Sequence, residues 1–144
     1  MLYFDTSFLV PLLLEEATSA KIERFMAHLP TGEMAVSHWT RVEFSSLLTR
    51  EVRTGGLNSD AAKRTNVEFE AVVADSFIVL LPEADDFDLA REYLGHHQTG
   101  LRAGDALHLA IARNRRAEAI YSLDKTMLKA GKILGLPVSP GIRL

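Results

Sequence analysis

Short apolar segments with the character of β-strands alternate along the chain with longer segments of helical periodicity. Strands are predicted around Phe4 and at residues 34–37, 77–81, 119–123 and 136–138. Helices are predicted directly after residue 5 and at residues 18–29, 42–52, 58–74, 85–94, 106–111 and 127–134. Parallel strands need long crossover connections, which are usually helices. The alternation therefore predicts an α/β fold in which helices flank a central, mostly parallel sheet.

Local signals refine the ends of these elements. The first helix is expected to be capped by Thr6 or Ser7, because short hydroxyl side chains accept hydrogen bonds from unpaired backbone amides. The apolar face of the helix over residues 42–52 is expected to contain Val42, Leu47, Leu48 and Val52. A glycine-containing loop is predicted over residues 95–104.

The bulk composition excludes several kinds of site. The chain has 144 residues, no cysteine and a net charge of −3. This length fits one domain over residues 1–144, and the lack of cysteine excludes disulfides, thiolate metal sites and cysteine nucleophiles. The acidic balance counts mildly against nucleic-acid binding, although a bound metal ion restores charge where carboxylates gather. No signal-peptide pattern or membrane-length apolar run is found, so a cytoplasmic location without membrane attachment is expected.

Four acids occupy positions where the predicted fold would place a ligand site. Asp5 follows the first predicted strand, and Asp124 follows the strand over residues 119–123. Asp105 opens the apolar helix after the glycine-containing loop, and Glu43 lies near the beginning of the helix after the second strand. Ligands of open parallel sheets bind beyond the carboxyl ends of the strands. We therefore expect the four carboxylates to face one edge of the sheet.

Each acid also has an ordinary structural interpretation when it is taken alone. Asp105 and Asp124 stand where acids cap helices or stabilise their first turns. Glu43 is a candidate for a solvated helix acid or for an ion pair with Arg41. Asp5 is the hardest to explain in this way, because an acid that ends a buried strand is costly without a partner.

Taken together, the four acids point to a metal ion. Gathered carboxylates repel one another, and some take up protons unless a cation compensates their charge. Mg²⁺ binds a few carboxylate oxygens plus water and leaves room for a phosphate oxygen. One or two such ions make a bound water a better nucleophile and neutralise the charge of a phosphodiester. The set therefore predicts a divalent-metal site that acts on a nucleic acid.

Four segments resemble the acidic motifs of the PIN-domain family, in the order that the family has them. Residues 1–10, MLYFDTSFLV, resemble its opening strand, aspartate and hydroxyl residues. Residues 37–44, SHWTRVEF, and 120–125, IYSLDK, resemble its second and fourth motifs. Residues 101–110, LRAGDALHLA, closely resemble its third motif. The resemblance runs to about residue 138, and the short chain is similar in length to the VapC-type toxins of bacterial toxin–antitoxin pairs.

The resemblance implies a three-layer, Rossmann-like PIN domain with Mg²⁺- or Mn²⁺-dependent endoribonuclease activity. Its implied catalytic and metal-binding residues are Asp5, Glu43, Asp105 and Asp124. It also implies an RNA substrate, a homodimer, inhibition by a small VapB-like antitoxin, and contact with DNA only through that antitoxin. Many relatives carry Asn or Asp around the fourth acid where this chain has SLDK, so Asp124 is expected to reach the metal either directly or through water.

Other polar residues are candidates for supporting roles. Ser122 and the pair Thr6 and Ser7 are placed to orient carboxylates, or simply to cap a helix or form a turn. Arg102, three residues before Asp105, is placed to contact a phosphate. A basic group near residues 55 and 56 is a candidate substrate or antitoxin surface or a solvated face: Arg50, Arg53, Lys63 and Arg64. The five histidines show no zinc-motif spacing.

Two alternatives from other functional classes stay open on the sequence alone. The first is a non-catalytic co-regulator that acts together with a DNA-contacting antitoxin. The second is a magnesium-binding phosphoacceptor domain of the receiver type, which normally carries an acidic pair at its first strand and a phosphoacceptor aspartate at the end of a central strand. Here Asp5 stands alone. A haloacid-dehalogenase-like phosphatase would need a second aspartate that the segment Asp5–Thr6–Ser7 lacks.

Overall fold

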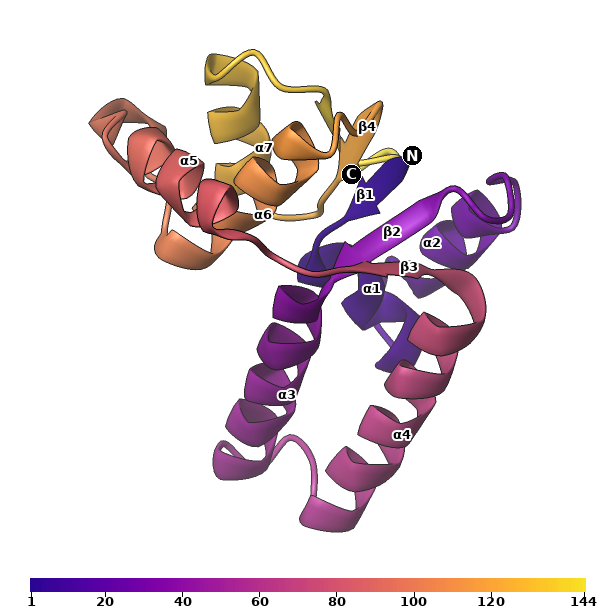
Figure 1. The fold of residues 1–144 in the computed structure, drawn as a ribbon. Coiled ribbons are helices and arrows are strands. Elements are labelled where there is room, and N and C mark those ends of the chain that lie inside the picture. Colours follow the sequence, from indigo (N-terminus) through magenta and orange to yellow (C-terminus); the bar gives the residue numbers. More distant parts are fainter.

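The computed structural model describes residues 1–144 and contains one five-stranded sheet with the strand order β3-β2-β1-β4-β5 (Figure 1). The strands are β1 Leu2–Phe4, β2 Met34–Ser37, β3 Ile78–Leu80, β4 Ala119–Tyr121 and β5 Val138–Ser139. The connecting helices are α1 Thr6–Leu13, α2 Ser19–Met26, α3 His38–Arg53, α4 Ser59–Ser76, α5 Ala84–Leu94, α6 Ala103–Asn114 and α7 Lys125–Ile133, with a 3₁₀ turn, η1, at His97–Thr99. All neighbouring strands pair in parallel, so the predicted α/β class is confirmed.

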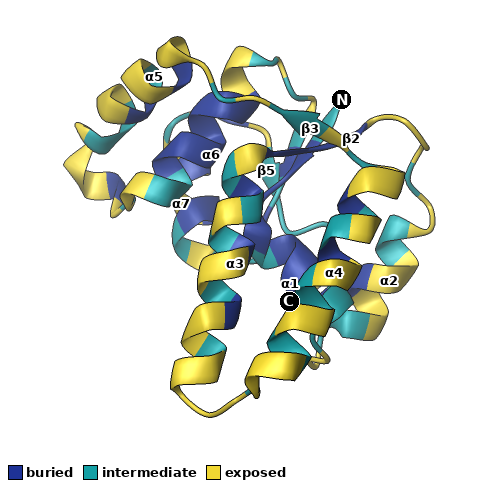
Figure 2. Ribbon diagram, turned by 60° about the horizontal axis from the view of Figure 1, so that its bottom comes forward, coloured by how far each residue is buried: buried dark blue, intermediate teal, exposed yellow.

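The central strand β1 separates two packed layers of helices. Successive side chains of a strand point to opposite faces of its sheet. Tyr3 packs with α5, α6 and α7 on one face, whereas Phe4 packs with helices α1 to α4 on the other. Both side chains are fully buried. Figure 2 shows the buried stripes of the helices turned toward the sheet from both sides, which makes a three-layer arrangement.

The cap of α1 differs from the prediction. The N-cap is Asp5, whose Oδ1 accepts a hydrogen bond from the backbone N–H of Phe8 at 3.1 Å. Thr6 and Ser7, the predicted caps, already lie inside the helix. The aspartate therefore combines the ordinary capping role with a place at the end of β1, which leaves both hydroxyl groups to form other contacts.

The buried face of α3 also differs from the prediction. Leu48 is buried as predicted, but Val42 is 56% exposed and Val52 is 36% exposed, and the buried face includes Phe44 in their place. Phe44 stacks on Phe69 of α4, with ring centroids 4.0 Å apart. The predicted loop over residues 95–104 is shorter than expected, because it contains η1 and ends where α6 begins at Ala103. No helix has the length and apolar character needed to cross a membrane.

Candidate active site

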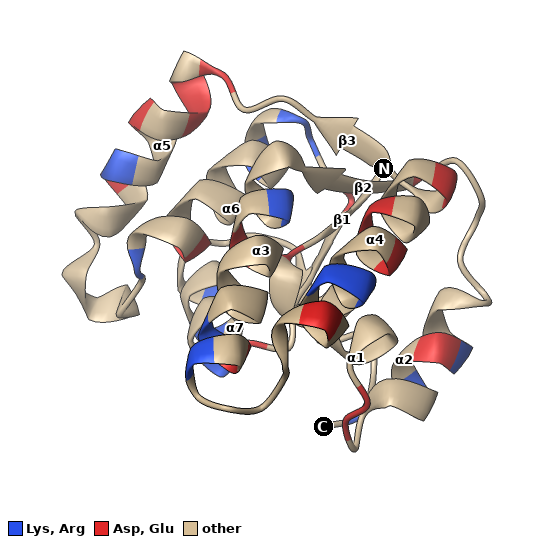
Figure 3. Ribbon diagram, turned by 90° about the horizontal axis from the view of Figure 1, so that it is seen from below, with Lys and Arg blue, Asp and Glu red and all other residues tan.

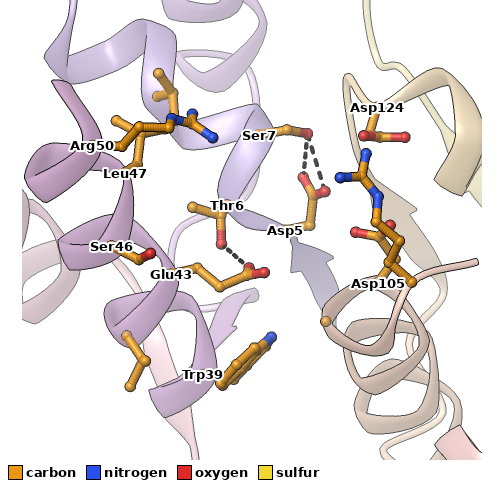
Figure 4. Close-up of a pocket in the computed structure, with 14 residues that line it drawn as sticks. Asp5, Thr6, Ser7, Trp39, Glu43, Ser46, Leu47, Arg50, Asp105 and Asp124 are labelled. Carbon is orange, nitrogen blue, oxygen red and sulfur yellow. Dashed lines mark hydrogen bonds between the residues drawn. The ribbon is translucent and has the colours of Figure 1, made fainter. Parts of the chain in front are cut away.

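A pocket of about 490 Å³ lies where α1, α3 and α6 begin beyond the strands (Figure 4). Its lining includes the four predicted acids, Asp5, Glu43, Asp105 and Asp124. Asp5 directly follows β1, and Asp124 lies in the short loop after the neighbouring strand β4, which ends at Tyr121, earlier than predicted. Glu43 and Asp105 come from the early turns of α3 and α6. Figure 3 shows acidic positions gathered between α3, α6 and α7. The topology thus brings together residues that are up to 119 positions apart in the sequence.

Asp5 is held by neutral donors. Ser7 donates to its Oδ1 at 2.7 Å, and Ser122 donates to its Oδ2 at 2.8 Å. Ser7 in turn accepts from the backbone N–H of Leu123 at 2.9 Å, which ties the loop after β4 to α1. Asp5 is only 3% exposed. Burial raises its pKa, although these hydrogen bonds and the nearby His108 oppose the shift.

Glu43 lies in a more polar environment than Asp5. Thr6 donates to its Oε1 at 2.5 Å, and Nε2 of His108 contacts the same oxygen. Burial alone would raise the pKa of Glu43, but the contact with His108 outweighs it, so the pKa is lowered. The predicted alternative of an ion pair with Arg41 is wrong, because Arg41 pairs with Glu70 instead. The helix therefore turns Glu43 into the pocket and Arg41 away from it.

Asp105 and Asp124 form the other wall of the pocket. Asp124 is the N-cap of α7, and its Oδ1 accepts from the backbone N–H of Met127 at 2.9 Å. Asp105 lies in the first turn of α6 and makes no capping hydrogen bond. Burial and the negative charge of Asp124, with smaller contributions from the other two acids, raise the pKa of Asp105 to about 6. The pocket thus carries more negative charge than its own residues compensate.

The chemistry of this donor set suits a hard divalent cation. Carboxylate oxygens are the ligands that Mg²⁺ and Mn²⁺ prefer, and the raised pKa of Asp105 is the shift that gathered carboxylates show without a cation. In this structure, no group of three or more His, Asp or Glu side chains is arranged to hold a metal ion. The residues therefore fit the ion in type, while their spacing is wider than a closed coordination shell.

Four further residues line the pocket. Arg50 of α3 and Arg102, at the N-cap of α6, both line it, and neither forms an ion pair with its carboxylates. Gly104 allows α6 to approach α3 closely, because a Cβ atom there would lie 2.8 Å from Oε2 of Glu43 and 3.4 Å from Trp39. The indole Nε1 of Trp39 is buried without a hydrogen-bond partner. A side chain at position 104 would thus displace the carboxylate of Glu43.

His108 contacts one of the pocket acids, although the sequence did not predict this contact. This side chain is 1% exposed, and it is in contact with Glu43, which lies 65 positions away in the sequence. The available signal was its spacing from Asp105, because residues three apart on a helix share a face. One histidine therefore lies behind the pocket, where it contacts the carboxylate of Glu43.

Comparisons with known proteins agree with this fold. A model of the PIN domain family matches residues 2–133. Among solved structures, the chain is similar to Mycobacterium tuberculosis VapC20, described as a sarcin–ricin-loop-cleaving toxin, with 23% identity over 91% of this chain and 95% of that one and a TM-score of 0.73. No curated protein sequence matches this chain.

Two further solved structures are similar as well. FitAcB from Neisseria gonorrhoeae shares 16% identity over 100% of both chains with a TM-score of 0.71. VapBC2 from Rickettsia felis, bound to a DNA fragment from its promoter, shares 13% identity over 96% of this chain and 98% of that one with a TM-score of 0.69. At such identities the likeness shows the fold, and the three-layer, Rossmann-like prediction is confirmed.

Proposed function

Since this chain belongs to the PIN domain family, we propose that it is a Mg²⁺- or Mn²⁺-dependent endoribonuclease and the toxin of a toxin–antitoxin pair. The observation that supports this most strongly is the pocket lined by four carboxylates from separate parts of the sequence. The similarity to a toxin described as cleaving the sarcin–ricin loop supports RNA as the substrate class. The family match also leaves the receiver-type alternative without support.

In this proposal, Asp5, Glu43 and Asp105 hold the metal, and Asp124 completes the pocket directly or through water. A bound divalent ion supplies an activated water and neutralises the charge of the scissile phosphate. The chain's own residues keep the carboxylates oriented before the ion arrives. Ser7 and Ser122 do this for Asp5 in the structure, and Thr6 does it for Glu43. Such supporting hydrogen bonds reduce the rearrangement that binding requires.

The proposed contacts with RNA come from the two arginines of the pocket. Arg50 and Arg102 lie on different walls of the pocket, on α3 and at the start of α6. A guanidinium group binds phosphate through two parallel hydrogen bonds, so it can hold a backbone phosphate next to the scissile one. Since neither arginine is committed to an ion pair within the protein, both are available to the substrate.

The test is cleavage by the purified protein. Ribosomal RNA that contains the sarcin–ricin loop, transfer RNA and messenger RNA are incubated with the protein in Mg²⁺ and in EDTA. Cleavage is expected only with the metal, and Asp5→Asn is expected to abolish it while circular dichroism shows an intact fold. Asp88→Asn serves as the control, because Asp88 is 71% exposed on α5. Undiminished cleavage by Asp5→Asn would refute the mechanism.

The proposed partner is a small VapB-like antitoxin, because two similar structures are VapBC and FitAB assemblies. A second hollow lies between α3 and α4, with Leu48, Val52 and Val67 in its lining and with Arg53 and Lys63 as its basic groups. We propose it as part of the antitoxin surface. Charge reversal by Arg53→Glu and Lys63→Glu is expected to weaken the complex while leaving metal-dependent RNA cleavage intact.

The co-regulator role is kept as a second function, because the similar VapBC2 assembly is bound to promoter DNA. In this proposal, the chain reaches DNA only through its antitoxin. An Asp5→Asn protein that still represses its own promoter with the antitoxin would separate this role from RNA cleavage. We also propose that residues 1–144 form one domain and assemble as a homodimer; a single unfolding transition and a dimer mass by light scattering would support these two points.

A further inference from the structure

A buried chain of hydrogen bonds runs beneath Glu43. The Tyr3 hydroxyl lies 2.7 Å from Nδ1 of His108 and donates to Ser37 at 3.1 Å, and Nε2 of His108 contacts Oε1 of Glu43. Tyr3 and Ser37 are 0% exposed and His108 is 1% exposed. The histidine thus has a partner at each ring nitrogen within the core. Buried polar groups are costly unless they are hydrogen-bonded, and these contacts satisfy both nitrogens of the ring.

The position of His108 connects both walls of the pocket. His108 and Asp105 are three residues apart on α6, whereas Glu43 belongs to α3 on the other side of the pocket. One ring therefore fixes the distance between the helix that presents Asp105 and the carboxylate of Glu43. Gly104 completes this contact from the same helix turn, since a Cβ atom there would lie 2.8 Å from Oε2 of Glu43.

The direction of the hydrogen bond follows from the chemistry of the two groups. An ionised carboxylate only accepts hydrogen bonds, so Nε2 of His108 is the donor. The hydroxyl of Thr6 donates to the same oxygen, Oε1. The indole of Trp39 also lies beside the carboxylate and helps to lower its pKa, and Glu43 lines the pocket. The surrounding groups thus hold the carboxylate of Glu43 at the wall of the pocket, where a ligand can contact it.

We propose that His108 is a positioning residue that holds Glu43 in its metal-binding orientation through the Nε2–H group, with Tyr3 fixing the ring from behind. The inference rests on the proposed function, because it assigns a role in the same site. In this arrangement His108 is neither a metal ligand nor a nucleophile, because protein partners occupy both of its ring nitrogens.

Two substitutions separate this role from simple packing. The amide nitrogen of glutamine can take the place of Nε2 and donate to Glu43, whereas asparagine reaches only the position of Nδ1 next to Tyr3. His108→Asn is expected to weaken Mn²⁺ binding, measured by isothermal titration calorimetry, by about 10- to 100-fold, as removal of such supporting groups does. His108→Gln is expected to bind at least about tenfold more tightly than His108→Asn.

Asn114→Ala is the matched control, because it removes a partly buried hydrogen bond to Asp86, 2.7 Å long, at the far end of the same helix and outside the pocket. It is expected to lower the melting temperature and to leave the Mn²⁺ affinity unchanged. Equal loss of Mn²⁺ affinity in His108→Gln and His108→Asn would overturn the proposal, since packing alone would then explain both. Unchanged Mn²⁺ affinity in a folded His108→Asn protein would also overturn the proposal.

A second measurement uses the folded protein with its histidine in place. In ¹⁵N-histidine-labelled protein, the Nε2 resonance of His108 is expected to shift when Glu43→Gln removes the carboxylate charge. An unchanged Nε2 resonance would show that His108 does not contact Glu43 and would overturn the proposal. If the wild-type protein binds no Mn²⁺ and cleaves no RNA, the proposed function fails, and the resonance still decides whether His108 holds Glu43.

Discussion

Asp5 and Asp86 are both buried carboxylates, and the charges around them differ. Asp86, at 0% exposed, lies 3.5 Å from the guanidinium of Arg115, accepts from Asn114 at 2.7 Å and accepts from the backbone N–H of Glu83 at 2.8 Å. Asp5, at 3% exposed, accepts hydrogen bonds only from neutral donors. The first acid is in contact with a cation of the protein, and the second is not.

This difference in contacting charge distinguishes the two acids, whereas their burial does not. A buried carboxylate beside an arginine completes a structural network, in which removal of one partner leaves the other unpaired. The pocket around Asp5 holds three further carboxylates, and the only cationic group within contact of any of them is His108, at Glu43. In the proposed function a metal ion supplies the contacting positive charge, and burial together with the charge of Asp124 raises the pKa of Asp105 in its absence.

The largest effect that separates the two regions is expected on catalysis. Asp105→Asn should lower kcat/KM for RNA cleavage by more than about 100-fold, the upper end for residues that only support a metal ligand. Asp85→Asn is the matched control, because Asp85 occupies the first turn of α5 as Asp105 occupies the first turn of α6. Similar activity of the two variants would show that the charge deficit of the pocket has no catalytic meaning.

For stability, the larger effect is expected from substitution of Asp86 and the smaller one from substitution of Asp5. Asp86→Ala should lower the free energy of unfolding by about 3 kcal/mol, because it leaves Arg115 partly buried without its main partner. Asp5→Asn should change that free energy by less than about 1 kcal/mol, since asparagine can still accept the hydrogen bond that caps α1. Urea denaturation of both variants measures the difference. A larger loss in Asp5→Asn than in Asp86→Ala would contradict the comparison.

The sequence predicted the elements well where local signals decide them. The strands at residues 34–37 and 119–123 are apolar runs next to helix starts, and β2 and β4 lie there. It predicted the buried face of α3 poorly, because Val42 and Phe44 both fit a helical period and only packing against Phe69 decides between them. Periodicity shows that a helix is amphipathic more reliably than which residues its neighbours cover.

The same limit applies to the site. Asp5 and Asp124 were placed by the rule that ligands bind at the carboxyl ends of parallel strands, and both line the pocket. The contact between His108 and Glu43 joins residues 65 positions apart, so no local pattern predicts it. The countercharge of Asp86 is equally non-local, because Arg115 lies 29 positions away. Sequence reasoning thus finds the acids but not whether each is compensated.

A smaller effect is expected on metal binding as a function of pH. The carboxyl group of Asp105 has a pKa of about 6, so it holds a proton below that value and must release it to a metal ion. Mn²⁺ affinity should therefore fall by about tenfold per pH unit below pH 6 and level off above it. Calorimetric titrations at pH 5, 6, 7 and 8 measure this. An affinity that is flat between pH 5 and 7 would rule out Asp105 as a ligand.

The smallest effect concerns stability without metal. The pKa of Asp105 is raised from 3.8 in the unfolded chain to about 6 in the fold, so the folded state binds more protons between these values and its stability falls as pH rises from about 4 to 6. In Asp105→Asn this pH-dependent loss of stability is absent, because asparagine does not ionise. At pH 8 without metal, its melting temperature should exceed that of the wild type by about 3 °C.

The difference in melting temperature between Asp105→Asn and the wild type should change under two conditions that alter the charge of the pocket. At pH 4 the Asp105 carboxyl is largely protonated in the fold, so wild type and Asp105→Asn should melt at nearly the same temperature. Saturating Mg²⁺ at pH 8 stabilises only the protein that binds it, so the wild type should then become the more stable of the two. If Asp105→Asn were less stable than the wild type at pH 8 without metal, the pocket would already be compensated, as Asp86 is by Arg115, and the distinction between the two regions would fail.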